Sequence, residues 1–206
     1  MRKEHCHCLI IILIHLLANM YFKWNGISYF TSYLYQIFTL CSCEWLLDSD
    51  FKFSIFKDQN ALSFKKILIG AAYGFGFAVA VIVFFALVSE VTLFPQYVFE
   101  MTGGMIFNQI IFQLLVALAE ESMYRFYLYE ELLHLRIPRW IAALVLSLLF
   151  ASVHFYHNGR WMQFGIALVF SLATFRIKIK SRGNSYLLLA AMHFTYDLCC
   201  CFIFTI

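Results

Sequence analysis

Residues 67–89 read ILIGAAYGFGFAVAVIVFFALVS, a continuous run without a charged side chain. A helix needs about 20 consecutive apolar residues to cross the hydrocarbon layer of a bilayer, and this run is long enough. It therefore predicts a transmembrane helix. The rest of the chain agrees, because 63% of its 206 residues are hydrophobic and only 13% are charged. Soluble domains are nearer one half apolar and about one quarter charged.

Six further apolar segments flank this run, and together they predict an all-α, polytopic transmembrane helical bundle. The seven segments occupy roughly residues 6–22, 27–47, 67–89, 106–128, 139–156, 161–175 and 184–206. The length leaves no room for a separate soluble domain, so residues 1–206 are expected to form a single membrane domain. The first segment follows Arg2 and Lys3 like a signal peptide, but no small-x-small cleavage site follows it, so we expect a retained helix.

The basic residues predict the orientation of this bundle. If the N-terminus is cytoplasmic, twelve Lys and Arg residues fall in cytoplasmic stretches: Arg2, Lys3, Lys52, Lys57, Lys65, Lys66, Arg136, Arg139, Arg176, Lys178, Lys180 and Arg182. Only Lys23 and Arg160 fall in the alternate loops. Cytoplasmic loops of membrane proteins carry an excess of basic residues, so the pattern predicts an N-in, C-out bundle. We expect it in a cytoplasmic membrane of the bacterial type.

Several classes of site are excluded by the same composition. No basic stripe with interleaved aromatic residues lies on a polar background, so a nucleic-acid partner is not expected. The seven cysteines lie in or beside apolar runs and are odd in number, which does not fit a disulfide framework. The run His5-Cys6-His7-Cys8 alternates in a way that does not fit a tetrahedral metal site from one segment.

Ionisable residues inside the apolar segments are the candidates for function, because each costs at least about 2.5 kcal/mol to place at mid-membrane. The first cluster is Glu120-Glu121-Ser-Met-Tyr-Arg125 in segment 106–128. Glu121 and Arg125 are four residues apart, so they share a helical face and can pair. Glu120 is turned away from Arg125 and stays free to face a polar cavity as a base. A structural ion pair near the cytoplasmic interface is the alternative.

Two further clusters follow in later segments. Phe150 and His154 lie four residues apart in segment 139–156, and His157 follows. His193 and Asp197 share a face of the last segment. Alone, His154 is typical of a hydrogen-bonded residue between helices, and the His–Asp pair has a structural alternative.

Taken together, two imidazoles and carboxylates from three helices can activate a water molecule and stabilise an oxyanion. The same side chains could also hold a divalent metal. The sequence contains neither the His-Glu-x-x-His motif of zincins nor a Gly-x-Ser-x-Gly motif.

The three clusters, in this order and each in a hydrophobic helix, resemble the motifs of the CPBP family. This family comprises the CAAX proteases and bacteriocin-processing enzymes, also called Abi proteins. The resemblance covers roughly residues 106–200, whereas the first three segments carry none of its motifs. It implies an intramembrane endopeptidase, or metalloendopeptidase, that cleaves a peptide or membrane-protein substrate.

The resemblance also implies roles for the individual residues. Glu120 would polarise the attacking water with help from His154, and His193 with Asp197 would stabilise the oxyanion or help to bind a metal. It leaves open whether Zn or another divalent metal, held by Glu120, His154 and His193, takes part.

Supporting roles would fall to Glu121, Arg125, Phe150 and His157, the last a looser match to a histidine of the prenyl-protein proteases. One departure concerns Asp197, because the family motif commonly ends in Asn. An ionised aspartate cannot donate a hydrogen bond to an oxyanion, which favours a metal-binding or His-orienting role.

The position of His154 does not fit the predicted orientation easily. Glu120 and His193 fall towards the cytoplasmic ends of their segments, but His154 lies about 15 residues past Arg139, near the outer end. A site reached from the cytoplasm would need the segment 139–156 to be tilted, short or broken.

Two other functions stay open at this stage. A non-catalytic member of the same fold would act as an immunity or scaffold protein in the bilayer. A small ion or proton transporter would use Glu120, His154, His193 and Asp197 as a relay, although the sequence shows no inverted repeat.

Overall fold

The computed structural model describes residues 10, 13–14, 17–18, 29–47, 64–88, 92–158, 161–181 and 185–205. Most of the predicted first segment, 6–22, lies outside these residues, as does the side chain of His157. The described chain is helical, as predicted, apart from one pair of two-residue strands.

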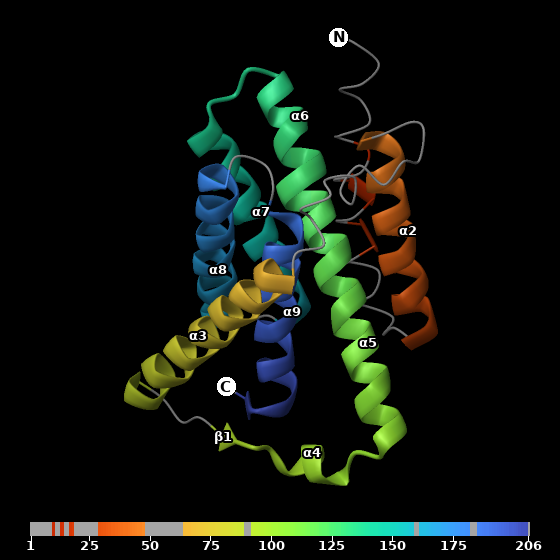
Figure 1. The fold of residues 1–206 in the computed structure, drawn as a ribbon, viewed down its shortest axis with the longest axis vertical. Helices are drawn as coiled ribbons and strands as arrows, with labels where there is room; N and C mark the ends of the chain where they lie inside the picture. Colours follow the sequence, from red (N-terminus) through yellow and green to blue (C-terminus); the bar gives the residue numbers. More distant parts are fainter. Residues whose placement is uncertain are drawn as a thin grey trace.

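From residue 29 onward, the described residues form seven helices, with α5, η2 and α6 counted as one continuous helix (Figure 1). Three helices are long and apolar enough to cross a membrane: Phe64–Val88, Gly103–His134 and Trp161–Lys180. Two shorter helices are also apolar. The full set is α2 (Tyr29–Leu47), α3 (Phe64–Val88), α4 (Gln96–Glu100), α5 (Gly103–Glu120), η2 (Glu121–Leu128), α6 (Tyr129–His134), α7 (Arg139–Asn158), α8 (Trp161–Lys180) and α9 (Tyr186–Phe202).

The longest helix changes its hydrogen-bond pattern at its middle. Thr102 caps the start of α5 by accepting a hydrogen bond from the backbone N–H of Met105, and α-helix continues to Glu120. The next eight residues form the π-helix η2, and α6 then continues to His134. A π-helix bonds residue i to i+5 and frequently occurs at functional sites. Here it contains the Glu121 and Arg125 motif positions, and every η2 side chain except Phe126 is buried.

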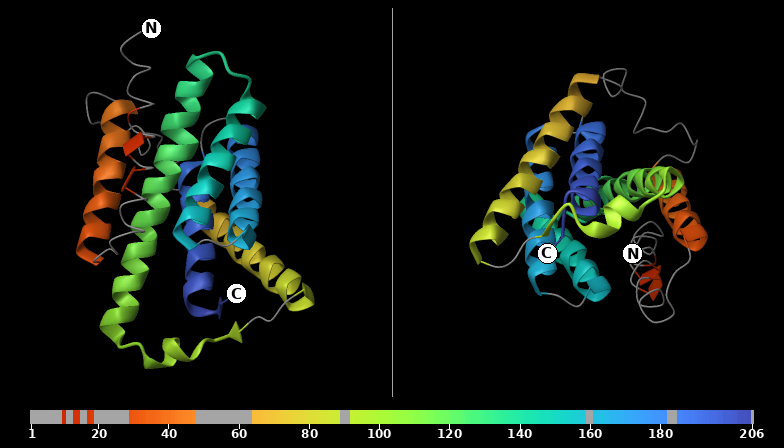
Figure 2. Two further views of the ribbon diagram at one scale, coloured as in Figure 1. Left: turned by 180° about the vertical axis from the view of Figure 1, so that it is seen from behind. Right: turned by 90° about the horizontal axis from the view of Figure 1, so that it is seen from below.

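Helix α3 crosses α9 obliquely and at very short range (Figures 1 and 2). The contact is made by Gly70 and Gly74, which face the backbone of α9. A Cβ atom at either position would lie 2.2 Å from a backbone oxygen, that of Leu188 or Met192. Small residues allow helix backbones in membranes to approach in this way.

A strand pair fastens the end of α9 to the segment that follows α3. Strand β1 (Thr92–Leu93) pairs antiparallel with β2 (Phe204–Thr205). The backbone N–H of Phe94 donates to the oxygen of Ile203 at 2.7 Å, and the hydroxyl of Tyr97 donates to the oxygen of Cys201 at 2.9 Å. These bonds fix the position of the last turn of α9.

Candidate active site

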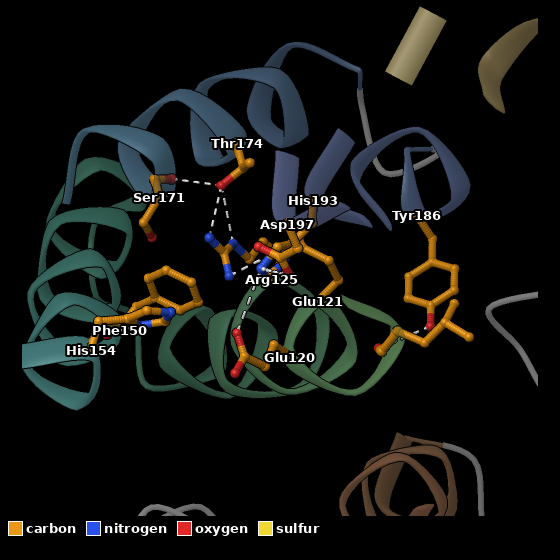
Figure 3. Close-up of polar contacts among 11 residues, drawn as sticks. Glu120, Glu121, Arg125, Phe150, His154, Ser171, Thr174, Tyr186, His193 and Asp197 are labelled. Carbon is orange, nitrogen blue, oxygen red and sulfur yellow. Dashed lines mark hydrogen bonds and ion pairs between the residues drawn. The ribbon is translucent and has the colours of Figure 1, made fainter. Parts of the chain in front are cut away.

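The predicted motif residues come together at the centre of the bundle, where η2, α7, α8 and α9 meet (Figure 3). Glu121 is fully buried, with no solvent-exposed surface. Its Oε1 atom accepts a hydrogen bond from Nδ1 of His193 at 2.9 Å and lies 3.4 Å from Nη1 of Arg125. The spacing predicted the pair with Arg125, and the structure places the two groups in contact. The bond to His193 joins η2 to α9.

Arg125 has no exposed surface, and its guanidinium contacts a hydroxyl group, two aromatic rings and the Glu121 carboxylate. Its Nε and Nη2 atoms both donate to Oγ1 of Thr174 on α8, at 3.1 and 2.9 Å. The guanidinium lies 4.5 Å from the centre of the Phe150 ring and 5.4 Å from that of Phe175. Contact with aromatic faces and a carboxylate satisfies a buried guanidinium. Arg125 therefore ties η2, α7 and α8 together.

Three carboxyl groups converge on the imidazole of His193. Its Nδ1 atom is bonded to Glu121, as described above. On the other edge of the ring, the Nε2 atom lies 3.4 Å from Oδ2 of Asp197 and 3.7 Å from Oε2 of Glu120. The two glutamates differ in access, because the side chain of Glu120 is 13% exposed and that of Glu121 is 0% exposed. Glu120 is thus the more accessible of the two glutamates of the motif.

His154 approaches the same region from the end of α7. Its Nδ1 atom donates to the backbone oxygen of Phe150 at 2.9 Å, since a carbonyl oxygen can only accept. In the neutral ring this leaves Nε2 as an acceptor. The imidazole also packs on the Phe150 ring, with 4.4 Å between the ring centres, and the same Phe150 ring lies 5.9 Å from that of His193.

A cavity of about 260 Å³ connects His154 with the carboxyl cluster. Residues of α7, α8, α9 and β2 line it: Phe150, His154, Gln163, Ile166, Ala167, Phe170, His193, Tyr196, Asp197, Cys200 and Phe204. Glu120 is not among the lining residues, but its Oε2 atom lies 3.7 Å from Nε2 of His193, which does line the cavity. The α8 residues, Gln163 above all, carry no motif signal and were not predicted.

The predicted metal ligands do not form a metal-binding group in the structure. Among the described residues, no three His, Cys, Asp or Glu side chains are grouped so that they could hold one ion. Both ring nitrogens of His193 face carboxylates, and Nδ1 of His154 is bonded to a backbone oxygen. A metal held by Glu120, His154 and His193 stays a prediction.

Buried acids and histidines at a cavity within apolar helices define the class of this chain as a helical integral membrane protein with an internal polar site. Residues 102–199 match the family described as type II CAAX prenyl endopeptidase Rce1-like. The chain therefore contains a domain of the Rce1-like CAAX prenyl endopeptidases, within the CPBP or Abi proteins, over these residues. No curated protein and no solved structure matches the chain.

Proposed function

We propose that this chain is an intramembrane endopeptidase that hydrolyses a peptide bond with water activated by its carboxyl and histidine cluster. The observation that carries the proposal is the convergence of Glu120, Glu121 and Asp197 on His193 at the wall of a cavity that also receives His154. Groups that can accept and return protons, placed beside a cavity, are what hydrolysis requires. The family match of residues 102–199 supports the same activity.

In the proposed reaction, Glu120 takes a proton from a water molecule at the Nε2 edge of His193. The water oxygen bonds to the carbonyl carbon of the scissile bond, and the carbonyl oxygen becomes an oxyanion. The bond from carbon to nitrogen then breaks, and the proton held by Glu120 passes to the leaving nitrogen. Water is consumed, and the carboxylate is regenerated.

The other residues would orient the attacking water and stabilise the oxyanion. His154 offers Nε2 to the cavity, where it can orient the attacking water. A protonated Nε2 of His193 can donate to the oxyanion, while Asp197 at 3.4 Å keeps that edge of the ring in place. This arrangement gives Asp197 an orienting role that does not require it to donate a hydrogen bond. Glu121 fixes the opposite edge of the ring through Nδ1.

Cleavage by variants in proteoliposomes tests the proposal. The purified chain is incubated with a pool of membrane-associated peptides, and new peptide termini are read by mass spectrometry. We expect Glu120→Ala and His154→Ala to abolish cleavage, with a loss of at least about 10²-fold, while expression and membrane insertion are kept. Glu100→Ala and His134→Ala are matched controls, because both side chains are exposed away from the cluster.

Unchanged processing in both variants would remove the enzyme proposal. Protection against a toxin that survives Glu120→Ala would favour an immunity or scaffold protein instead. Ion flux into the same proteoliposomes would favour a transporter.

A further inference from the structure

A single face of α9 forms one wall of the cavity. His193, Tyr196, Asp197 and Cys200 all line the cavity, and their spacing of three or four residues places them in one row along the helix. The proposed reaction uses His193 and Asp197 but gives no task to Tyr196. A tyrosine carries a hydroxyl group that can donate a hydrogen bond. Tyr196 is therefore a polar group at the cavity whose chemistry is still unassigned.

Aromatic contacts hold the ring of Tyr196 in place. The ring stacks on that of Phe170, with 5.1 Å between the ring centres and 25° between the planes, and it meets the ring of Phe77 edge to face at 5.2 Å. The same Phe170 ring lies 5.2 Å from the imidazole of His193. One aromatic ring of α8 thus contacts both side chains, so Tyr196 and His193 lie side by side on the same wall.

The hydroxyl of Tyr196 has polar neighbours. They include the thiol of Cys200, one helical turn further on, and the carboxyl group of Asp197, the next residue in the chain. A thiol sulfur is a weak acceptor, so a hydrogen bond to it is weaker than one to a charged oxygen. Because a hydroxyl hydrogen rotates about the bond from carbon to oxygen, the hydroxyl of Tyr196 can turn to a stronger acceptor when one forms in the cavity.

The candidate site is rich in acceptors and poor in donors. The Nε2 atom of His193 can carry one hydrogen, and it already faces Asp197 at 3.4 Å and Glu120 at 3.7 Å. His154 uses its Nδ1 hydrogen for a backbone oxygen, so Nε2 of the neutral ring can only accept. An ionised Asp197 accepts as well. An oxyanion formed in the cavity therefore needs a donor besides His193.

We propose that Tyr196 is a further catalytic residue, whose hydroxyl donates a hydrogen bond to the oxyanion formed when water attacks the scissile carbonyl. This role rests on the proposed endopeptidase function and adds a residue to it. The hydroxyl exchanges its interaction with Cys200 for one with the oxyanion, and no proton is transferred. The new bond strengthens as the carbonyl oxygen gains negative charge, so it favours the transition state over the bound substrate.

Tyr196→Phe tests this role, because it removes the hydroxyl and keeps the ring that packs on Phe170 and Phe77. Cleavage kinetics are measured in proteoliposomes beside Tyr73→Phe, the same change at an exposed position of α3. We expect kcat of Tyr196→Phe to fall about 10²–10³-fold while KM stays within about twofold, since the lost bond forms only in the transition state. Tyr73→Phe should keep both wild-type values.

Ligand binding supplies a second measurement that needs no turnover. The probe is the phosphonamidate analogue of benzyloxycarbonyl-glycyl-leucine amide, whose tetrahedral, anionic phosphorus group resembles the oxyanion intermediate. It is compared with the parent amide on the same protein preparation, so a fraction of unfolded protein leaves the ratio of the two affinities unchanged. The wild type should bind the phosphonamidate at least about 10²-fold more tightly than the amide. Tyr196→Phe should reduce this preference at least about tenfold.

The outcomes separate the role of Tyr196 from the endopeptidase function itself. A wild type that cleaves, with Tyr196→Phe equal to it in kcat and in its preference for the phosphonamidate, would overturn the role and leave the endopeptidase proposal in place. A lower kcat accompanied by an equal loss of affinity for both ligands would make Tyr196 a structural residue, and would overturn the role as well. A wild type that neither cleaves nor prefers the phosphonamidate would remove the endopeptidase proposal, and this role with it.

Discussion

Replacing Gly74 by alanine should displace His193 of the candidate site, although the new methyl group makes no contact with that histidine. The added Cβ would lie 2.2 Å from the backbone oxygen of Met192 and 3.0 Å from Cβ of Thr195. Carbon and oxygen atoms in close helix contacts are normally about 3.3–3.6 Å apart, so α3 and α9 must separate by about 1 Å. Met192 immediately precedes His193, whose ring is held by carboxylates on η2 and α5 as well as on α9. A misplacement of about 1 Å can cost 10²-fold in rate.

The matched control for this variant is Gly76→Ala in the same helix, where an added Cβ meets no atom within 4 Å. Turnover by Gly74→Ala should fall about 10²-fold, with an overpacking cost of roughly 1–3 kcal/mol in the free energy of unfolding. Gly76→Ala should keep its rate and gain about 0.5–1 kcal/mol from helix propensity. Both are measured as peptide cleavage in proteoliposomes and as unfolding in a titration with SDS. Equal rates and equal stabilities for the two variants would refute the close approach of α3 and α9.

Two further predictions concern the buried ion network and are measured in the same SDS titration. Thr174→Val removes the oxygen that accepts from two nitrogens of Arg125, and should cost about 1.5–3 kcal/mol, whereas Thr174→Ser should cost clearly less. A loss for Thr174→Ser as large as that for Thr174→Val would contradict this reasoning, because serine keeps the hydroxyl and lacks only the methyl group. Glu121→Ala leaves Arg125 and His193 without their shared buried carboxylate, and should cost about 3–5 kcal/mol. Glu131→Ala, which breaks a partly exposed pair, should cost less than about 1 kcal/mol, and a loss that small at Glu121 would contradict the network.

The apolar runs predicted the helices well, because lipid requires long helical segments wherever the chain crosses it. The run 67–89 corresponds to α3, and 139–156 corresponds to α7. The run 161–175 was too short, because α8 continues to Lys180 through five residues, three of which are basic. Amphipathic ends of this kind are not visible in an apolar count. The two-residue strands and α4 were also missed, since such short elements depend on tertiary contacts. Orientation stays a prediction.

The candidate site was predictable within a helix and less so between helices. The pair of Glu121 with Arg125 and that of His193 with Asp197 follow from the period of the helix, and both are in contact. The bond from His193 to Glu121 joins residues 72 apart and depends on how α9 packs against η2. Thr174 could not be singled out, because a threonine in an apolar helix commonly bonds only to its own backbone. The roles of these residues stay predictions.

The π-helix has a consequence for how this sequence can vary. A backbone hydrogen bond in η2 joins residues five apart, whereas one in α5 joins residues four apart. The direction in which Glu120 points relative to Arg136 therefore depends on how many residues lie between them. Exchanging one side chain for another leaves that count unchanged. Losing a single residue between positions 121 and 128 would let this stretch form ordinary α-helix, and the side chains inside it, Arg125 among them, would then occupy different positions around the helix axis. Natural variation in this stretch is therefore expected to substitute residues, most readily at Phe126, the η2 side chain that is not buried, and not to insert or delete them.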